Sequence, residues 1–91
     1  MTASRPLIAI VVPVFNERDN LRPFHEAVTA VMRTLAVEYD WEFVFVDDGS
    51  RDGSFDVLRG IRPEDDRVHA LRFPRNFGSH VAIAAGIDYC R

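Results

Sequence analysis

The sequence predicts an α/β fold in which three parallel strands alternate with three helices. Apolar runs at residues 7–14, 43–46 and 68–73 are each followed by a turn-rich stretch and then by a segment of helical character. Strands separated by helices in this order lie parallel in one sheet and are joined by right-handed crossovers. The 91 residues suffice for one small domain. Because a final helix normally leads into another strand, we expect this β-α-β-α-β-α segment to be an incomplete domain.

The central apolar run, Phe43–Val46, stops at two carboxylates, Asp47 and Asp48. A continuous run of this length is typical of a strand that is buried on both faces. The acidic pair therefore falls at the carboxyl end of a strand, which is the edge where open α/β sheets bind ligands. Side chains alternate across a strand, so we expect one carboxylate to face a crevice and the other to hold a turn or a neighbouring loop.

The first apolar run, residues 7–14, is rich in β-branched residues and is predicted to be a second buried strand. Pro13 cannot donate to a strand ladder, so pairing should end close to it. Asn20 is predicted to cap the helix that follows. The expected apolar face of that helix consists of Leu21, Phe24, Val28, Val31 and Leu35.

Two shorter helices are predicted in the remainder of the chain. Ser54 is expected to cap the first, which buries Phe55, Leu58 and Ile61 and ends before Pro63. Ser79 is expected to cap the second, after a strand at residues 68–73. This last helix has apolar positions at Val81, Ala84 and Ile87, and small residues at Ala82, Ala85 and Gly86 that allow close packing.

Composition excludes several classes of function. A net charge of −3 gives no basic footprint for nucleic acid, and no apolar run is long enough to span a membrane. All eleven basic residues are arginine, which rules out chemistry that depends on lysine. Cys90 is the one cysteine, so an internal disulfide is impossible and a cytoplasmic location is expected. We assign no role to Cys90 or to His80.

The loops after the three strands, residues 13–17, 47–52 and 75–78, should meet at one edge of the sheet. Carboxylates there accept hydrogen bonds from a nucleobase or from ribose hydroxyls, and an arginine stacks on a base or contacts phosphate. The first loop lacks the G-x-G-x-x-G pattern of dinucleotide sites. The residues alone thus indicate a candidate nucleotide site. They leave open that the acidic stretch and the Asn76–Gly78 turn are turn chemistry only, and that Glu17 is a solvated first-turn carboxylate.

Three motifs in order resemble the family 2 glycosyltransferases of GT-A fold, and they cover nearly the whole chain. They are VVPVFNE at Val11–Glu17, VDDGSRDGS at Val46–Ser54 and RNFGSHVAIAAGID at Arg75–Asp88. The nearest likeness is to polyprenyl-phosphate sugar transferases of the dolichol-phosphate mannose synthase type. The resemblance implies that the chain is the N-terminal, nucleotide-binding half of a Rossmann-like GT-A domain.

The resemblance also implies roles for individual residues at a nucleotide-sugar site. The nucleotide pocket would be lined by Pro13, Phe15 and Glu17; Val46, Asp47 and Asp48 would flank base and ribose; Arg75 and Asn76 would close the floor. Phe15 stands where many members have tyrosine, so a hydroxyl contact is lost there. Ser79 and His80 occur where members often have lysine, which puts a cationic phosphate contact at that point in doubt.

For the whole protein, the resemblance implies inverting transfer of a sugar from a UDP- or GDP-sugar to polyprenyl phosphate, at the inner face of a membrane. Family members hold Mg²⁺ or Mn²⁺ with an Asp-x-Asp motif that follows the last helix, and their catalytic base lies further on. Neither is among these 91 residues, so we expect the chain alone to be inactive and to hold no metal tightly. The first strand is internal in the GT-A fold. We therefore expect Leu7–Val14 to expose an edge that makes the isolated chain a homo-oligomer.

Two other interpretations compete with the glycosyltransferase. A response-regulator receiver also has paired aspartates at a strand end, but the pair follows its first strand and a lysine is required. Here the pair follows the second strand and lysine is absent, so a receiver is disfavoured. A small non-catalytic α/β binding or interaction module remains as the alternative.

Overall fold

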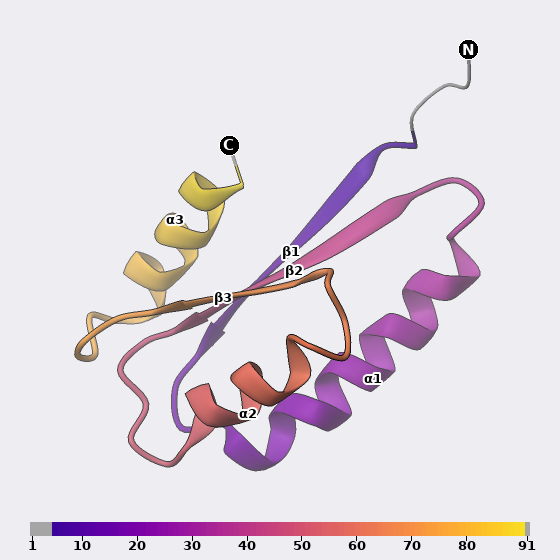
Figure 1. The fold of residues 1–91 in the computed structure, drawn as a ribbon. Coiled ribbons are helices and arrows are strands. Elements are labelled where there is room, and N and C mark those ends of the chain that lie inside the picture. Colours follow the sequence, from indigo (N-terminus) through magenta and orange to yellow (C-terminus); the bar gives the residue numbers. More distant parts are fainter. Residues whose placement is uncertain (1–4, 91) are drawn as a thin grey trace.

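The computed structural model describes residues 5–90, which form one parallel sheet with helices on both faces (Figure 1). The elements follow the chain as β1 (Leu7–Val14), α1 (Arg18–Thr34), β2 (Asp40–Asp47), α2 (Ser54–Ile61), β3 (Val68–Arg72) and α3 (Ser79–Tyr89). The strands are ordered β1-β2-β3, and both neighbouring pairs are parallel. The predicted α/β fold and its β-α-β-α-β-α order are confirmed.

The register of the sheet brings the ends of all three strands to one line. Val14 of β1 pairs with Asp47 of β2, and Asp47 pairs in turn with Arg72 of β3. β1 ends one residue after Pro13, in agreement with the prediction that pairing stops close to this proline. The three following loops therefore start side by side at the carboxyl edge of the sheet.

β2 is the centre of the core, because helices cover it on both faces. Phe43 and Phe45 stack at 5.5 Å between ring centroids and pack with residues of α1 and α2. Val44 and Val46 point the other way and pack with Ala82 of α3. All four side chains are fully buried, which confirms the predicted burial of this strand on both faces.

β1 is more exposed than predicted. Only Val14 of this strand is buried, and Leu7 is 57% exposed. The physical reason is its position: within residues 5–90, β1 has a neighbouring strand on one side only. The expectation of a second strand buried on both faces is therefore wrong for the described chain.

The predicted start and buried face of α1 also need correction. The helix begins at Arg18, two residues before Asn20, whose side chain instead donates to Glu17 Oε2 at 2.6 Å. Its buried residues are Leu21 and Met32, whereas Val31 is 59% exposed. The inward face is rotated because His25 contacts the ring of Phe43 at 5.0 Å and so occupies an inward position.

α3 packs on the sheet through its small residues. Ala82 and Gly86 are buried, and a Cβ added at Gly86 would lie 2.4 Å from Val11 Cγ1. Val81, Ala84 and Ile87 lie outside this contact and are exposed, so the expected apolar face is wrong, whereas close approach through Ala82 and Gly86 is confirmed. The expected caps Ser54 and Ser79 are the first helical residues, each directly after a glycine with positive φ.

Candidate functional site

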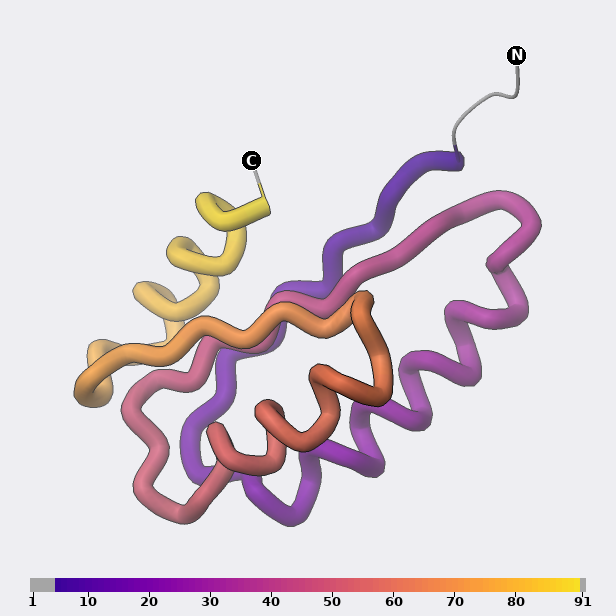
Figure 2. Tube along the Cα trace, viewed as in Figure 1, coloured from indigo at the N-terminus to yellow at the C-terminus, as the bar shows by residue number. Residues whose placement is uncertain are grey.

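Three loops meet at the carboxyl edge of the sheet (Figure 2). They lead from β1 to α1, from β2 to α2 and from β3 to α3. α1 and α2 lie on one face of the sheet and α3 on the other, so the loops that leave β2 and β3 diverge towards opposite faces (Figure 1). A divergence of this kind between neighbouring strands opens the crevice where open α/β sheets bind ligands.

The second and third loops are in direct backbone contact at Gly49. Its φ is 75°, in the left-handed region that glycine adopts without strain. A Cβ added at this position would lie 2.3 Å from the carbonyl carbon of Arg75 and 2.4 Å from the amide nitrogen of Asn76. Only glycine fits there, and this contact fixes the spacing of the two loops.

Asp48 holds the third loop against the second. Its Oδ1 accepts from the backbone N–H of Phe77 at 2.7 Å. Its Oδ2 accepts from the N–H of Gly78 and from Asn76 Nδ2, each at 3.0 Å. A carboxylate at this point lies at the N-terminus of α3, where the helix dipole favours negative charge. Asp48 is therefore a loop-holding residue, as the sequence predicted for one member of the pair.

Side chains of the second loop also cap α1 from a distance. The Glu17 N–H donates to Ser54 Oγ at 3.0 Å, and the Arg18 N–H donates to Asp52 Oδ2 at 3.1 Å. Hydrogen bonds from Ser54 and from these N–H groups lower the pKa of Asp52 below its usual value, because they outweigh slight desolvation. Two further bonds join the same loops: Asn16 N–H to Ser50 Oγ and Arg51 N–H to Asn16 Oδ1, both at 2.9 Å.

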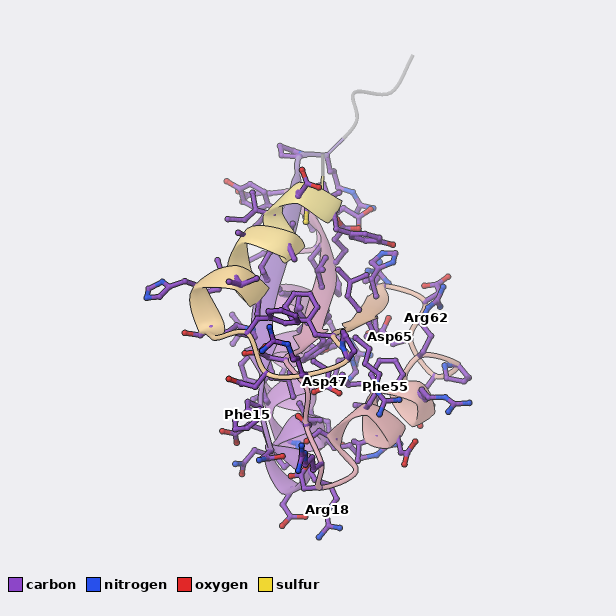
Figure 3. The ribbon with its side chains drawn as sticks, turned by 90° about the vertical axis from the view of Figure 1, so that its left-hand side faces the viewer. Phe15, Arg18, Asp47, Phe55, Arg62 and Asp65 are labelled. Atoms are coloured by element: carbon purple, nitrogen blue, oxygen red, sulfur yellow. The ribbon has the colours of Figure 1, made fainter. Side chains whose placement is uncertain are left out.

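Asp47 lies beneath the crevice rather than in it. Figure 3 looks onto this end of the molecule and shows Asp47 between Phe15 and Phe55. The side chain is fully buried; its Oδ1 accepts from the Ser50 N–H at 3.0 Å, and its Oδ2 has no donor among the described residues. A buried carboxylate oxygen without a donor is costly. A donor brought within reach of this atom would therefore be stabilising.

Two adjoining hollows lie among the three loops. The larger has a volume of about 560 Å³ and lies between the second and third loops and Phe15. The smaller has a volume of about 270 Å³ and is lined by residues of all three segments, including Pro13, Glu17 and Asp48. Phe15 and Asn76 line both and thus form the wall between them.

The structure brings six of the eight predicted site residues to these hollows. They are Pro13, Phe15, Glu17, Asp48, Arg75 and Asn76. The other two, Val46 and Asp47, are fully buried and line neither hollow. Sequence reasoning did not single out Arg51 and Arg72, which line the larger hollow. The signal available was a basic residue in the turn after one strand and another at the end of the next.

A third hollow of about 590 Å³ lies away from this crevice, between α1 and the segment that precedes β3. Several of its charged residues are already paired across the gap. Arg22 contacts Glu64 at 3.0 Å, and His25 contacts Asp65 at 2.7 Å. These pairs join α1 to the α2–β3 connection, so they stabilise the fold.

The described residues do not fit the metal that the resemblance implies. Within residues 5–90, no group of three or more His, Cys, Asp or Glu side chains is close enough to hold an ion. Asp48 accepts hydrogen bonds through both of its carboxylate oxygens, so its lone pairs are already engaged. In the same part of the chain, every helix falls short of the length and apolar content that a membrane crossing requires.

Parallel strands whose loops surround a crevice at their carboxyl ends define the molecule as an open α/β domain with a ligand site at that edge. More particularly, the chain belongs to glycosyl transferase family 2, because the sequence model of that family matches residues 9–91. The resemblance seen in the three motifs is thereby confirmed.

Individual relatives support this assignment. The chain is 44% identical over 85 residues to an undecaprenyl-phosphate 4-deoxy-4-formamido-L-arabinose transferase of Pseudomonas fluorescens strain SBW25, covering 92% of this chain and 24% of the relative. It is 41% identical over 83 residues to the uncharacterized glycosyltransferase YkcC of Bacillus subtilis strain 168, covering 91% and 25%. It is 37% identical over 82 residues to a bactoprenol glucosyl transferase of Shigella phage SfV, covering 90% and 26%. The chain thus spans about a quarter of the length of these relatives.

Proposed function

We propose that residues 1–91 form the nucleotide-binding part of a glycosyltransferase that takes its sugar from a UDP- or GDP-sugar. The observation that carries the proposal is the convergence of the three motif loops on two adjoining hollows, with six residues of those motifs in the lining. These loops belong to the region that the family model matches.

The chemistry of the lining suits a nucleotide. Phe15 is 47% exposed at the wall between the hollows, and a base stacked on an aromatic ring gains about 1–3 kcal/mol. Glu17 and Asp48 offer carboxylate oxygens to base N–H groups or ribose hydroxyls, and hydrogen bonds to charged groups contribute about 1.5–3 kcal/mol each. Arg75 adds a planar cation on the far side of the wall.

For the whole protein we propose inverting transfer of the sugar to polyprenyl phosphate. Support comes from the names of two relatives, which refer to undecaprenyl phosphate and to bactoprenol. An acceptor of this kind lies at a membrane surface, so we place the catalytic site at the cytoplasmic face. Mg²⁺ or Mn²⁺ would be held by residues outside this chain. The 91 residues alone would then bind nucleotide without transferring sugar, and transfer from a UDP- or GDP-sugar by the purified chain would contradict this point.

The test of the binding proposal is a titration of the ¹⁵N-labelled 91-residue chain with UDP, GDP and their sugars, followed by NMR. Shifts should be confined to residues 13–17, 47–52 and 75–78, and Phe15→Ala should weaken the binding of the preferred nucleotide. Tyr89→Ala is the matched control, because Tyr89 is 49% exposed and lines neither hollow. Absence of shifts at millimolar nucleotide would contradict the proposal.

The same titration tests the alternative of a non-catalytic α/β module. That alternative is favoured by one observation: Asp48, Ser50, Asp52 and Ser54 all have partners within the protein, as turn chemistry alone would require. Loops that serve only to hold one another would show no shifts with any nucleotide.

A further inference from the structure

The two hollows at the carboxyl edge carry opposite charges. In the larger one, the charged residues of the lining are Arg51, Arg72 and Arg75, and no carboxylate is among the described residues that line it. In the smaller one, the charged residues are Glu17 and Asp48, without a described cation. The wall of Phe15 and Asn76 therefore separates a basic compartment from an acidic one.

The three arginines of the basic compartment are free to bind an anion. Within residues 5–90, none of them is in an ion pair, whereas Arg18, Arg22, Arg59 and Arg67 each contact a carboxylate. Like charges gathered in one hollow repel each other, and an anion placed among them removes that repulsion.

Aromatic rings and the backbone position these guanidinium groups. Arg72 lies over the ring of Phe55 at 4.9 Å, and Arg75 lies over the ring of Phe77 at 4.2 Å. The backbone contact of Gly49 with Arg75 holds the second loop, and with it Arg51, beside the third. An arginine held on an aromatic face loses less freedom when it binds, and its planar fork matches the oxygens of a phosphate.

We propose that the larger hollow is a phosphate subsite, in which Arg51, Arg72 and Arg75 bind the diphosphate of the nucleotide, and that base and ribose lie in the smaller, carboxylate-lined hollow. A diphosphate carries the charge that the basic compartment lacks. Base N–H groups and ribose hydroxyls are the donors that Glu17 and Asp48 accept. The inference rests on the proposed nucleotide binding, and it adds the direction in which the ligand lies and two residues, Arg51 and Arg72, that contact it.

The test measures dissociation constants of uridine, UMP, UDP and inorganic pyrophosphate, and of the guanosine series, by calorimetry or NMR. We expect affinity to rise with each phosphate. Arg51→Gln, Arg72→Gln and Arg75→Gln should each weaken binding of the diphosphate about three- to tenfold, at about 1 kcal/mol for a partly exposed charge contact, and leave nucleoside affinity unchanged. Raised salt should weaken diphosphate binding in the parent chain more than in the variants.

Arg62→Gln is the matched control, because Arg62 is exposed and lies beside Asp65, away from Phe15 (Figure 3). Amide spectra of each variant verify that the fold is retained. Arg75→Lys separates charge from shape: it should keep part of the diphosphate affinity through its charge and lose the remainder with the fork.

The outcomes separate the two proposals. If a nucleotide binds but the arginine variants weaken nucleoside and diphosphate equally, or weaken neither, the phosphate subsite is overturned and the nucleotide site stands. If nucleotides do not bind but pyrophosphate does, in an arginine-dependent way, the anion subsite stands and the nucleotide assignment falls. If neither nucleotide nor pyrophosphate binds, both are overturned.

Discussion

Asp48 and Gly78 lie thirty residues apart in the chain, and Asp48 Oδ2 accepts a hydrogen bond from the Gly78 N–H at 3.0 Å. Gly78 directly precedes α3, so this carboxylate caps a helix that belongs to another loop. On the opposite side of the second loop, Asp52 and Ser54 cap α1 in the same manner. The acidic motif after β2 therefore organises both neighbouring loops, and the shape of the crevice depends on it.

Replacement of Asp48 by alanine should lower the free energy of unfolding and abolish nucleotide binding. The N–H groups of Phe77 and Gly78 would lose their acceptor, and each donor left without a partner costs about 1–3 kcal/mol. Urea denaturation and the NMR titration measure the two effects. Asp66→Asn is the control, because Asp66 is exposed and has no hydrogen bond among the described residues. An unchanged stability would show that the third loop does not depend on Asp48.

Two glycine replacements should separate backbone strain from steric contact. Gly78 has a φ of 102° and open space where a Cβ would lie, so Gly78→Ala should cost only the strain, about 1–3 kcal/mol. Gly49→Ala adds overlap with the backbone of Arg75 and should be more destabilising. Gly60→Ala, within α2, should be neutral or stabilising because its Cβ approaches only the end of the Arg22 side chain. Thermal unfolding ranks the three; equal effects at Gly49 and Gly78 would contradict the loop contact.

The sequence predicts the order of elements and the burial of β2 because both depend on local patterns. Apolar runs and turn residues mark the strands whatever their partners are. The capping of α1 is different: its acceptors, Asp52 and Ser54, lie more than thirty residues away, so the local pattern points wrongly to the nearby Asn20.

The candidate site divides along the same line. Six of its residues follow from motifs, whereas Arg51 and Arg72 become visible only when the second and third loops are placed together. The burial of Asp47 likewise depends on what packs around the end of β2, which periodicity along one strand does not show.

Removal of the Ser54 hydroxyl should loosen the start of α1. Ser54 Oγ accepts from the Glu17 N–H and donates to Asp52 Oδ1, so Ser54→Ala removes both bonds. The loss of a helix cap costs about 0.5–2 kcal/mol. Hydrogen exchange should become faster at the amides of residues 17 and 18 than in the parent chain. Ser79→Ala serves as control, because Ser79 is exposed and caps no helix by its side chain. Unchanged protection at residues 17 and 18 would contradict capping by the second loop.

We propose that the 91-residue chain self-associates along β1, whose outer edge is unpaired within the described residues. Exposed strand edges pair with other chains, and a charged side chain on the edge prevents this. Light scattering at high concentration should give a mass above that of a monomer, and Ala9→Lys should restore the monomer. Val37→Lys introduces the same charge at a position that is 90% exposed and lies outside the strand, so it should leave the mass unchanged. A monomeric parent chain would contradict the proposal.

The pair of His25 and Asp65 should make stability fall in acid. Burial alone would raise the pKa of Asp65, but the hydrogen bond from His25 and that from the Arg67 N–H outweigh it, and the pKa lies below its ordinary value of 3.8. A carboxyl whose pKa is lower in the folded state stabilises the fold above its unfolded pKa, and this contribution disappears as the pH falls through the folded pKa. Urea denaturation from pH 6 to pH 2.5 should therefore show a gap between the parent chain and Asp65→Asn that closes below about pH 4. The neighbouring replacement Asp66→Asn should show no such gap at neutral pH, because Asp66 is exposed and unpaired among the described residues. A constant gap for Asp65→Asn across this range would mean that the ionised carboxylate does not contribute to stability.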